Sequence, residues 1–247
     1  MHAPVPSSSA EPRQRWRLGY GRSANAPRLA QRDQNDAWEQ SLVGSGLPVA
    51  GLDLDPPRPR IVFAAPIGVG VAAEHELADL FLTDRRSVAE VREALELHMP
   101  AGHSLTGLHD VWLGAPPLPG RVEAADYRAR IATDDGSRQP DAMVDLAVLR
   151  HAAVGLLAAG HLPRTRHKGG RVVAYDLRPL IARVDVRGVT VSLEDGAIAE
   201  LCVRVRFDSE RGVGRPEDVL AAIADSAGVQ LLIVSLVRER IVLTGVD

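Results

Sequence analysis

The sequence predicts an α+β fold with antiparallel sheets, and three observations lead to this prediction. The 247 residues suffice for two domains of ordinary size. Short segments in which apolar and polar residues alternate, typical of half-buried strands, are interleaved with segments of helical periodicity. Hydrophobic residues make up 45% of the chain but aromatic residues only 4%, so Ala, Val, Leu and Ile are expected to form the cores.

The first half of the chain predicts six elements in the order β-α-β-β-α-β. The first strand is expected at residues 15–20, where Trp16, Leu18 and Tyr20 alternate with polar positions or glycine. A helix follows at about residues 35–43, with Trp38 facing inward. The remaining strands are expected at residues 61–65, 75–83 and 105–113.

The second helix of this half has the clearest local signal. Ser87 and Glu90 have the spacing of a capping box, in which each residue satisfies a free backbone amide of the other. Val88, Val91 and Leu95 form one apolar stripe after it. Before this helix, the prolines of residues 51–60 predict a stiff, extended loop.

The second half predicts a similar order. A strand is expected at residues 122–132, a long helix at 141–159, and two strands at 180–186 and 201–207. Pro216 starts a further helix that ends at Gly228, and strand material follows at 229–237 and 240–243. Extra extended segments at residues 172–175 and 189–193 do not belong to a plain six-element unit, and residues 161–171 are expected to form a flexible loop.

The order β-α-β-β-α-β is that of the ferredoxin-like, or split βαβ, arrangement. The sequence therefore predicts two tandem ferredoxin-like halves with antiparallel sheets. The expected organisation is a disordered N-terminus at residues 1–12, a first α+β domain at 13–113, a Pro/Gly-rich linker at 114–120 and a second α+β domain at 121–247.

The composition excludes several kinds of chemistry. Cys202 is the single cysteine, so this chain alone cannot form an intramolecular disulfide, an iron–sulfur cluster or a cysteine-rich zinc site. No metal or cofactor motif is present, and no cofactor is expected. The net charge of −3 gives no overall attraction to nucleic acid. Without a signal peptide or a membrane span, the protein is expected to be cytoplasmic.

Residues 31–76 carry a resemblance to a known family. Ala30-Gln31-Arg32-Asp33 is followed by Trp38, Gln40 and Gly46-Leu47-Pro48. The loop Leu54-Asp55-Pro56-Pro57-Arg58-Pro59-Arg60-Ile61, then Pro66-Ile67-Gly68-Val69-Gly70 and Glu74, complete the pattern. In these residues the chain resembles the radical SAM-linked protein family, a domain of unknown function found fused to, or encoded beside, cobalamin-binding radical SAM proteins. Weaker matches at residues 168–171, 176–180 and 215–220 extend the similarity over nearly the whole chain.

The resemblance implies a divergent member that works beside a radical SAM protein. A histidine of the family falls on Gln31 and an arginine on Gln40. Glutamine cannot act as a general base or become cationic near neutral pH, so any function of that histidine is altered or lost in this chain.

Four residues at matched positions form a candidate binding cleft: Asp33, Arg58, Arg60 and Glu74. Two arginines on a rigid proline loop suit a carboxylate, a phosphate or a protein partner. The alternative is that Asp33 caps the following helix, Glu74 lies at a strand edge and the prolines merely direct a connector. The sequence leaves both interpretations open.

Two basic clusters indicate a second kind of partner. One comprises Arg13, Arg15, Arg17, Arg22, Arg28 and Arg32. The other comprises Arg164, Arg166, Lys168 and Arg171. Arginine binds phosphate and stacks on bases, so RNA contact is one hypothesis and an ordinary solvated surface is the other.

Three functions follow from the sequence. The first is a non-catalytic accessory or binding protein that works with a radical SAM enzyme in RNA or tRNA modification. The second is an RNA-binding module acting through the arginine clusters. The third is an enzyme that uses the Asp33, Arg58, Arg60 and Glu74 cleft on a small anionic substrate, and a closed pocket joining these residues would favour it.

Overall fold

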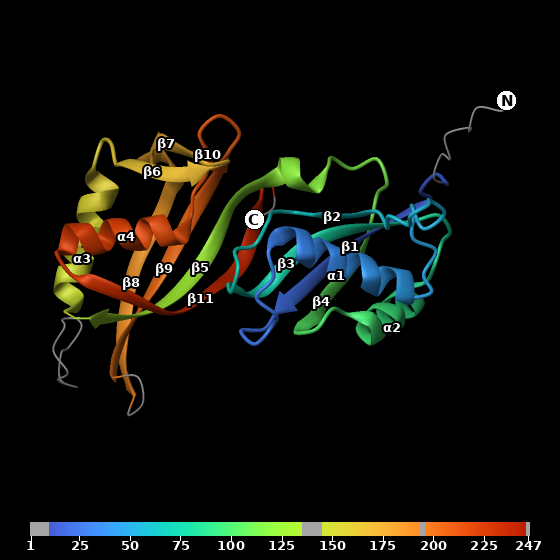
Figure 1. The fold of residues 1–247 in the computed structure, drawn as a ribbon, viewed down its shortest axis with the longest axis horizontal. Helices are drawn as coiled ribbons and strands as arrows, with labels where there is room; N and C mark the ends of the chain where they lie inside the picture. Colours follow the sequence, from blue (N-terminus) through green and yellow to red (C-terminus); the bar gives the residue numbers. More distant parts are fainter. Residues whose placement is uncertain (1–9, 135–144, 193–195, 246–247) are drawn as a thin grey trace. The chain divides into compact units, whose positions relative to one another are not determined.

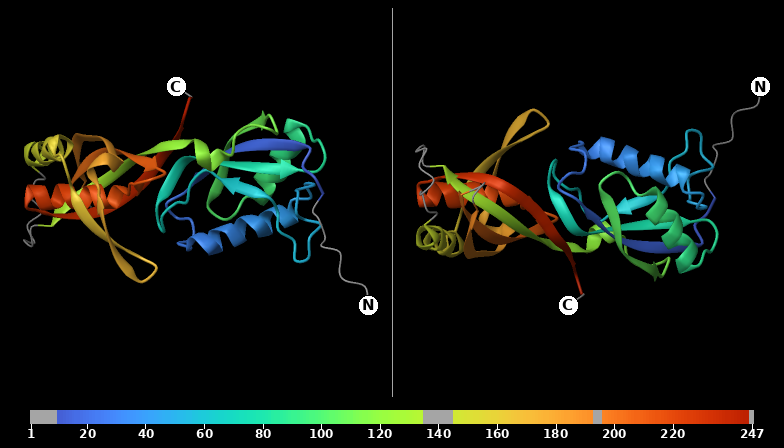
Figure 2. Two further views of the ribbon diagram at one scale, coloured as in Figure 1. Left: turned by 90° about the horizontal axis from the view of Figure 1, so that it is seen from above. Right: turned by 90° about the horizontal axis from the view of Figure 1, so that it is seen from below.

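The structure, a computed structural model, describes residues 10–134, 145–192 and 196–245. Within these residues the fold is mixed α/β, with four α-helices and strands that pair mostly antiparallel (Figures 1 and 2). The chain divides into two compact units, unit 1 (residues 1–122) and unit 2 (residues 123–247). No helix within the described ranges has the length and apolar character needed to span a membrane.

Unit 1 has its strands and α-helices in the predicted order β-α-β-β-α-β. The four strands pair antiparallel in the spatial order β2-β3-β1-β4, so each helix connects two strands that flank a third. The elements are β1 (Gln14–Arg22), α1 (Gln31–Gly44), β2 (Ile61–Phe63), β3 (Ala72–Leu82), α2 (Val88–His98) and β4 (His103–Val111).

Helix α1 begins at Gln31, about four residues before its predicted start. Its N-cap is Ala30, which has no side chain that could cap, and its first turn is polar, so no local signal marks the beginning. The capping box of α2 is confirmed: the Ser87 amide donates to Glu90 Oε2 at 2.8 Å, and the Glu90 amide donates to Ser87 Oγ at 3.3 Å. Val88 is exposed and does not belong to the apolar stripe.

The predicted disorder of residues 1–12 falls mainly on residues 1–9, which lie outside the described residues. The amide of Ala10 donates a hydrogen bond to Asp53 Oδ2 at 2.8 Å. Residues 114–120, predicted as a linker, belong to unit 1 and include the start of a short 3-10 helix, η1 (Leu118–Arg121), with Leu118 fully buried.

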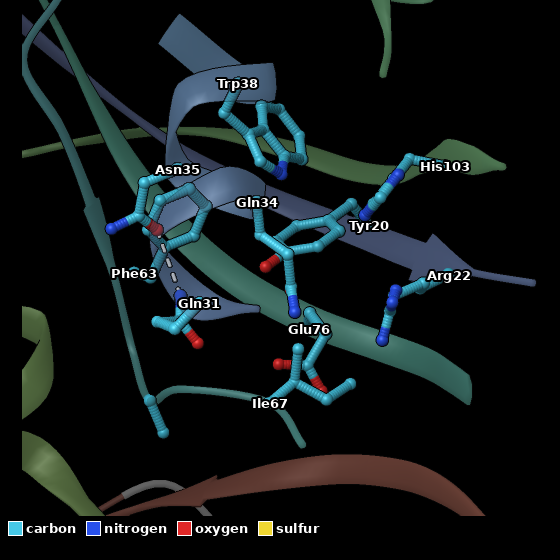
Figure 3. A pocket seen from close by; sticks show the side chains of 11 residues that line it. Tyr20, Arg22, Gln31, Gln34, Asn35, Trp38, Phe63, Ile67, Glu76 and His103 are labelled. Carbon is cyan, nitrogen blue, oxygen red and sulfur yellow. Dashed lines mark hydrogen bonds between the residues drawn. The ribbon is translucent and has the colours of Figure 1, made fainter. Parts of the chain in front are cut away.

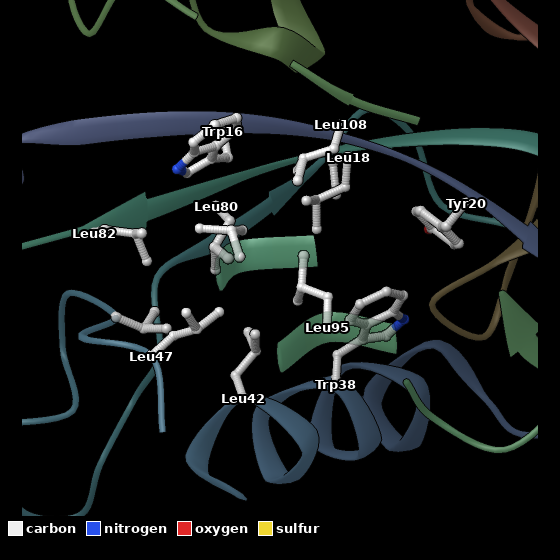
Figure 4. Close-up of a cluster of buried hydrophobic side chains, with 13 residues drawn as sticks. Trp16, Leu18, Tyr20, Trp38, Leu42, Leu47, Leu80, Leu82, Leu95 and Leu108 are labelled. Atoms are coloured by element: carbon white, nitrogen blue, oxygen red, sulfur yellow. The ribbon is translucent and has the colours of Figure 1, made fainter. Parts of the chain in front are cut away.

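Both helices of unit 1 pack on the same face of the sheet, as Figure 4 shows. Alternate residues of β1 face the helices, as the sequence predicts, and they meet Trp38 of α1 and Leu95 of α2. The shared core comprises Trp16, Leu18, Tyr20, Trp38, Leu42, Leu47, Val49, Ala78, Leu80, Leu82, Val91, Leu95 and Leu108.

The opposite face of this sheet contains a buried ionic network. Arg17 and Asp79 lie directly opposite one another on β1 and β3. Asp79 has no exposed surface; it accepts hydrogen bonds from Arg17 Nε at 2.8 Å and from Arg15 Nε at 3.0 Å. Arg15 also donates to the carbonyl oxygens of Ala115 and Pro116, so the network fixes the segment after β4 against the sheet.

Replacement of this carboxylate should destabilise unit 1. Asp79→Asn is expected to lower the free energy of unfolding by about 3–5 kcal/mol, because two guanidinium groups lose the charge that compensates for their burial. All three tryptophans of the chain, Trp16, Trp38 and Trp112, belong to unit 1. Urea unfolding followed by tryptophan fluorescence therefore measures the change in this unit.

The control is Asp84→Asn, because Asp84 is 59% exposed and its nearest arginine nitrogen, on Arg13, is 4.0 Å away. That substitution should change stability by less than about 0.5 kcal/mol. Equal effects of the two substitutions would contradict the assigned role of the network.

The described residues of unit 2 form nine further strands and α-helices and a short 3-10 helix, η2 (Arg178–Leu180). The nine are β5 (Val122–Asp134), α3 (Leu146–Ala158), β6 (Pro163–Lys168), β7 (Arg171–Asp176), β8 (Ile181–Ser192), β9 (Gly196–Asp208), β10 (Gly212–Val213), α4 (Pro216–Ala227) and β11 (Gln230–Leu243). Strand β9 pairs with β8, β10 and β5, and β5 neighbours β11. Residues 141–144 of the predicted helix lie outside the described ranges.

The prediction of a flexible loop at residues 161–171 is wrong, because most of this segment belongs to a β-hairpin. Strands β6 and β7 form a two-stranded sheet of their own. Gly169 and Gly170, at φ 57° and 77°, form the two-residue turn that connects them. A pair of glycines between alternating segments is the local signal for such a hairpin. The prediction of two plain tandem ferredoxin-like halves is not confirmed.

Candidate functional site

A small polar pocket lies at one end of the unit 1 core, where β1, β3 and β4 meet the first turns of α1 (Figure 3). We call it the Glu76 pocket. Its cavity is about 10 Å³, roughly the space for one water molecule. The lining residues are Tyr20, Arg22, Gln31, Gln34, Asn35, Trp38, Phe63, Ala65, Ile67, Glu76 and His103.

The pocket exists because the side chains that face the helices change from apolar to charged along the strands. On β3 they run from Leu82 and Leu80 to Glu76, which lies opposite Tyr20 of β1. On β1 they end at Arg22. Glu76 is 1% exposed and Arg22 is 3% exposed. Two oppositely charged side chains are thus buried at the edge of an otherwise apolar core.

Arg22 holds two loops in place. Its Nη1 donates to the carbonyl oxygens of Val71, at 2.8 Å, and Gly68, at 3.3 Å, and its Nη2 donates to that of Pro27, at 2.8 Å. Its Nε has no hydrogen-bond partner among the described residues. Burial lowers the pKa of Arg22, while Tyr20 and Glu76 act in the opposite direction.

His103 lies across from Arg22 on β4 and closes the pocket. Its ring is 5.6 Å from the Trp38 ring, edge to face, and its Nδ1 is 3.1 Å from the carbonyl oxygen of Ala101. Burial lowers the pKa of His103, the carbonyl of Ala101 opposes this, and the charge of Arg22 lowers the pKa further. The imidazole is therefore mainly neutral at pH 7.

A larger groove adjoins the pocket and shares Arg22 and His103 with it. We call it the Glu74 groove. Its cavity is about 500 Å³, within the usual range for small-ligand sites. Hydroxyl groups, one carboxylate and backbone line it, through Gly21, Ser23, Ala73, Glu74, Gly102, Ser104 and Thr106. Such a lining can form hydrogen bonds to a polar ligand, and one of its hydroxyl groups, Thr106 Oγ1, lies 2.9 Å from Nδ1 of His75.

The structure does not bring the four residues of the predicted cleft together. Glu74 lines the groove, whereas Asp33 is exposed in the first turn of α1 and caps nothing. Arg58 is exposed. The guanidinium of Arg60 lies 4.2 Å from the ring centre of Phe81, on the face of the sheet away from the helices. A closed pocket joining these four residues would favour the enzyme hypothesis, but the groove that Glu74 lines is not lined by the other three.

Gln31, where the sequence resemblance implies a histidine, lines the Glu76 pocket, and its Nε2 donates to Asn35 Oδ1 at 2.9 Å. Gln40 is exposed. The sequence analysis placed Arg22 in a basic cluster rather than in a pocket, and it did not single out Gln34, Glu76 or His103. The signal that could have found Arg22 and Glu76 is a charged residue at a core position of a strand otherwise filled by apolar side chains.

The basic cluster of unit 2 lies on the β6–β7 hairpin, which we call the basic arm (residues 163–176). The register pairs Arg164 with Tyr175, Arg166 with Val173 and Lys168 with Arg171. These positions all belong to one face of the ribbon, since side chains alternate between faces and paired residues share one. The arginines of the first predicted cluster differ, because Arg15 and Arg22 are buried within unit 1.

The base of the arm is anchored to α4 and β10. Arg164 forms an ion pair with Asp225 at 2.9 Å, and the Arg166 guanidinium lies 4.7 Å from the ring centre of Tyr175. The Tyr175 hydroxyl donates to Asp218 Oδ2 at 2.6 Å. Burial raises the pKa of Tyr175 to about 12, and the hydrogen bond to Asp218 adds to this shift. Arg171, next to the turn, is exposed.

Cys202 is buried on β9, and burial raises the pKa of its thiol. A buried thiol with a raised pKa is typical of an inert packing position. In the described parts of the chain, no group of three or more His, Cys, Asp or Glu side chains is placed to hold a metal ion.

The low pKa of His103 predicts a pH dependence of unit 1. The unfolded histidine titrates near 6.5, so its contribution to stability is fully present above that pH and is lost as the pH falls towards the lower folded pKa. His103→Asn should therefore reduce the decline in unfolding free energy between pH 7 and pH 5, measured by urea unfolding with tryptophan fluorescence. The exposed His109→Asn serves as the control, and an unchanged decline in the His103 variant would contradict the assignment.

Together, the two units define a mixed α/β protein with polar sites in unit 1 and a basic arm in unit 2. A family model matches residues 15–212, from β1 to β10. The chain belongs to this family, described as "Uncharacterized protein conserved in bacteria (DUF2344)". No curated protein matches the chain.

Proposed function

We propose that this chain is a non-catalytic accessory protein that binds RNA for a partner enzyme of the radical SAM class. The observation that carries the RNA part is the basic arm: a separate two-stranded ribbon whose register assigns Arg164, Arg166, Lys168 and Arg171 to one face. RNA phosphates are anionic, and arginine can bind them in a bidentate manner or stack on bases.

The contacts at the base of the arm hold its arginine side chains in place before a ligand binds. Arg164 is held by Asp225 and Arg166 is held by the Tyr175 ring and by the carbonyl of Val213, at 3.3 Å. A side chain that is already ordered loses less entropy when it binds. At the arm tip, Lys168 and Arg171 are paired across the turn in the strand register, and Arg171 is exposed.

The radical SAM part rests on the sequence resemblance and on the lone cysteine. Radical generation in that enzyme class needs a cysteine-held iron–sulfur cluster, and a chain with Cys202 alone cannot hold one. The partner would supply that chemistry, and this chain would supply recognition of the substrate.

We also propose that the two units are related split βαβ arrangements. If the basic arm and β10 are set aside, unit 2 has the order β5-α3-β8-β9-α4-β11 and the strand neighbours β8-β9-β5-β11. These correspond to β2-β3-β1-β4 of unit 1. In support, the two central strands of each unit carry one directly opposed Arg–Asp pair, Arg17–Asp79 in unit 1 and Arg204–Asp126 in unit 2.

The arm can be tested by neutralising its tip. Lys168→Gln with Arg171→Gln should weaken binding of a fluorescein-labelled single-stranded RNA at least tenfold at low salt, because charged hydrogen bonds each contribute about 1.5–3 kcal/mol. The slope of log K against log salt should fall by about 1.4, or about 0.7 for each lost phosphate contact. Fluorescence anisotropy of the full chain measures both quantities.

The matched control is Arg85→Gln with Arg92→Gln, which changes the charge equally at exposed positions of unit 1. Control and arm variants that lose affinity equally would remove the specific role of the arm. A wild-type chain that binds no RNA at low salt would remove the RNA proposal altogether.

The partner can be tested by affinity purification of the tagged full chain from its native cells under anaerobic conditions. We expect an iron–sulfur protein of the radical SAM class in the eluate, identified by mass spectrometry and by iron and sulfide analysis. Recovery of the chain without such a protein would contradict the partner proposal and would leave the RNA measurement to be judged independently.

A further inference from the structure

The sheet of unit 2 has an arginine-rich region on the face away from its helices. The helix-facing positions are apolar, as in the opposed pairs Tyr127–Val203 and Ala129–Leu201. The alternate residues of the same strands, which face away from the helices, include charged side chains. We call the four arginines Arg183 (β8), Arg204 and Arg206 (β9) and Arg240 (β11) the arginine face.

Asp126 is the buried carboxylate among these arginines, while Asp185 and Asp208, on the same face, form ion pairs with Arg187 and Arg211. Asp126 is 6% exposed and accepts hydrogen bonds from Arg204 Nε at 2.6 Å and from Arg240 Nε at 2.9 Å. Burial would raise the pKa of Asp126, but the hydrogen bonds and charges of Arg204 and Arg240 lower it below its ordinary value. Asp126 stays ionised and compensates for one of the two charges, while Glu123 contributes at longer range to Arg204.

Two further arginines add charge without adding a carboxylate. Arg183 lies directly opposite Arg204 across the β8–β9 ladder, and it is exposed. Like charges at directly opposed positions destabilise a sheet. Arg206 follows two residues along β9 on the same face, and its described hydrogen bond is to the neutral carbonyl oxygen of Pro179 at 3.1 Å. The arginine face therefore has a local excess of positive charge that an anion would relieve.

Unit 1 offers an internal comparison. There, Arg15 and Arg17 share Asp79 in the same way, but the arginines are only 3% and 13% exposed. The remaining donors of Arg15 are satisfied by the carbonyl oxygens of Ala115 and Pro116. In unit 2, Arg204 is 29% and Arg240 is 61% exposed. The same motif is covered by the chain in one unit and open to solvent in the other.

We infer that the arginine face is a second binding surface, for the phosphodiester groups of single-stranded RNA. The inference rests on the proposed RNA-binding function and adds a site that is separate from the basic arm. Between the arginines the face carries small or charged side chains, such as Ala124 and Cys202, rather than aromatic rings. Recognition of the backbone, with little dependence on base sequence, fits this composition.

The test is anisotropy of the full chain with Arg183→Gln and Arg206→Gln. Arg204 and Arg240 are retained because they compensate for buried Asp126. We expect affinity for a labelled single-stranded RNA to fall at least tenfold and the salt slope to fall by about 1.4. The control is again Arg85→Gln with Arg92→Gln. Arg183→Lys with Arg206→Lys should restore most of the affinity, because it restores charge without depending on the fit of the guanidinium.

The outcomes separate this site from the arm. A wild-type chain that binds RNA while the Arg183/Arg206 variant matches the control would overturn the arginine face and leave the arm variants to decide the proposed function. No binding by the wild type at low salt would overturn both. A matched single-stranded DNA distinguishes the source of the phosphates: equal loss for RNA and DNA supports backbone recognition alone, and a loss confined to RNA supports added contact with the 2′-hydroxyl groups.

Discussion

In both units, the central pair of strands is joined by an aspartate shared between two arginines on the face away from the helices. In unit 1 this aspartate is Asp79, and in unit 2 it is Asp126. A carboxylate buried in a sheet costs free energy unless cations and hydrogen bonds compensate for it, so the partners must remain in register. The register of the central strands then determines which residues face the helices. The core, the Glu76 pocket and the arginine face all depend on this arrangement.

The two units use the same arrangement differently. Around Asp79 the network is closed by the segment that leads out of unit 1, so its role is structural. Around Asp126 the arginines are partly exposed, and this openness is the basis of the binding surface that we propose there. The basic arm follows a similar division, since Arg164 and Arg166 hold its base while Arg171 is exposed at its tip. Arginine is thus a structural residue in both units, and it is the recognition residue that we propose for unit 2.

The unit 1 site illustrates how much of a site can be predicted from sequence. Glu74 and Gln31 were found through a matched pattern, and both line cavities. Asp33, Arg58 and Arg60 were matched in the same way, but they line neither cavity. A matched position indicates where the chain is related to a family and not which way the side chain points. Arg22 and His103, which border both cavities, belong to β1 and β4 and become neighbours only when those strands pair.

The sequence by itself determined the mixed α/β character, the element order of unit 1, the capping box of Ser87 and Glu90, and the absence of a cysteine-held cluster. These properties follow from local periodicity and composition, which a short segment encodes completely. Only the tertiary structure decided which charged residues share a face or a pocket. The reason is that Arg17 and Asp79 are 62 positions apart, and strand register depends on packing of the whole sheet. The hairpin of the basic arm combines both kinds of information. Its two-glycine turn can be predicted from the local sequence, whereas its contacts with α4 depend on the tertiary structure.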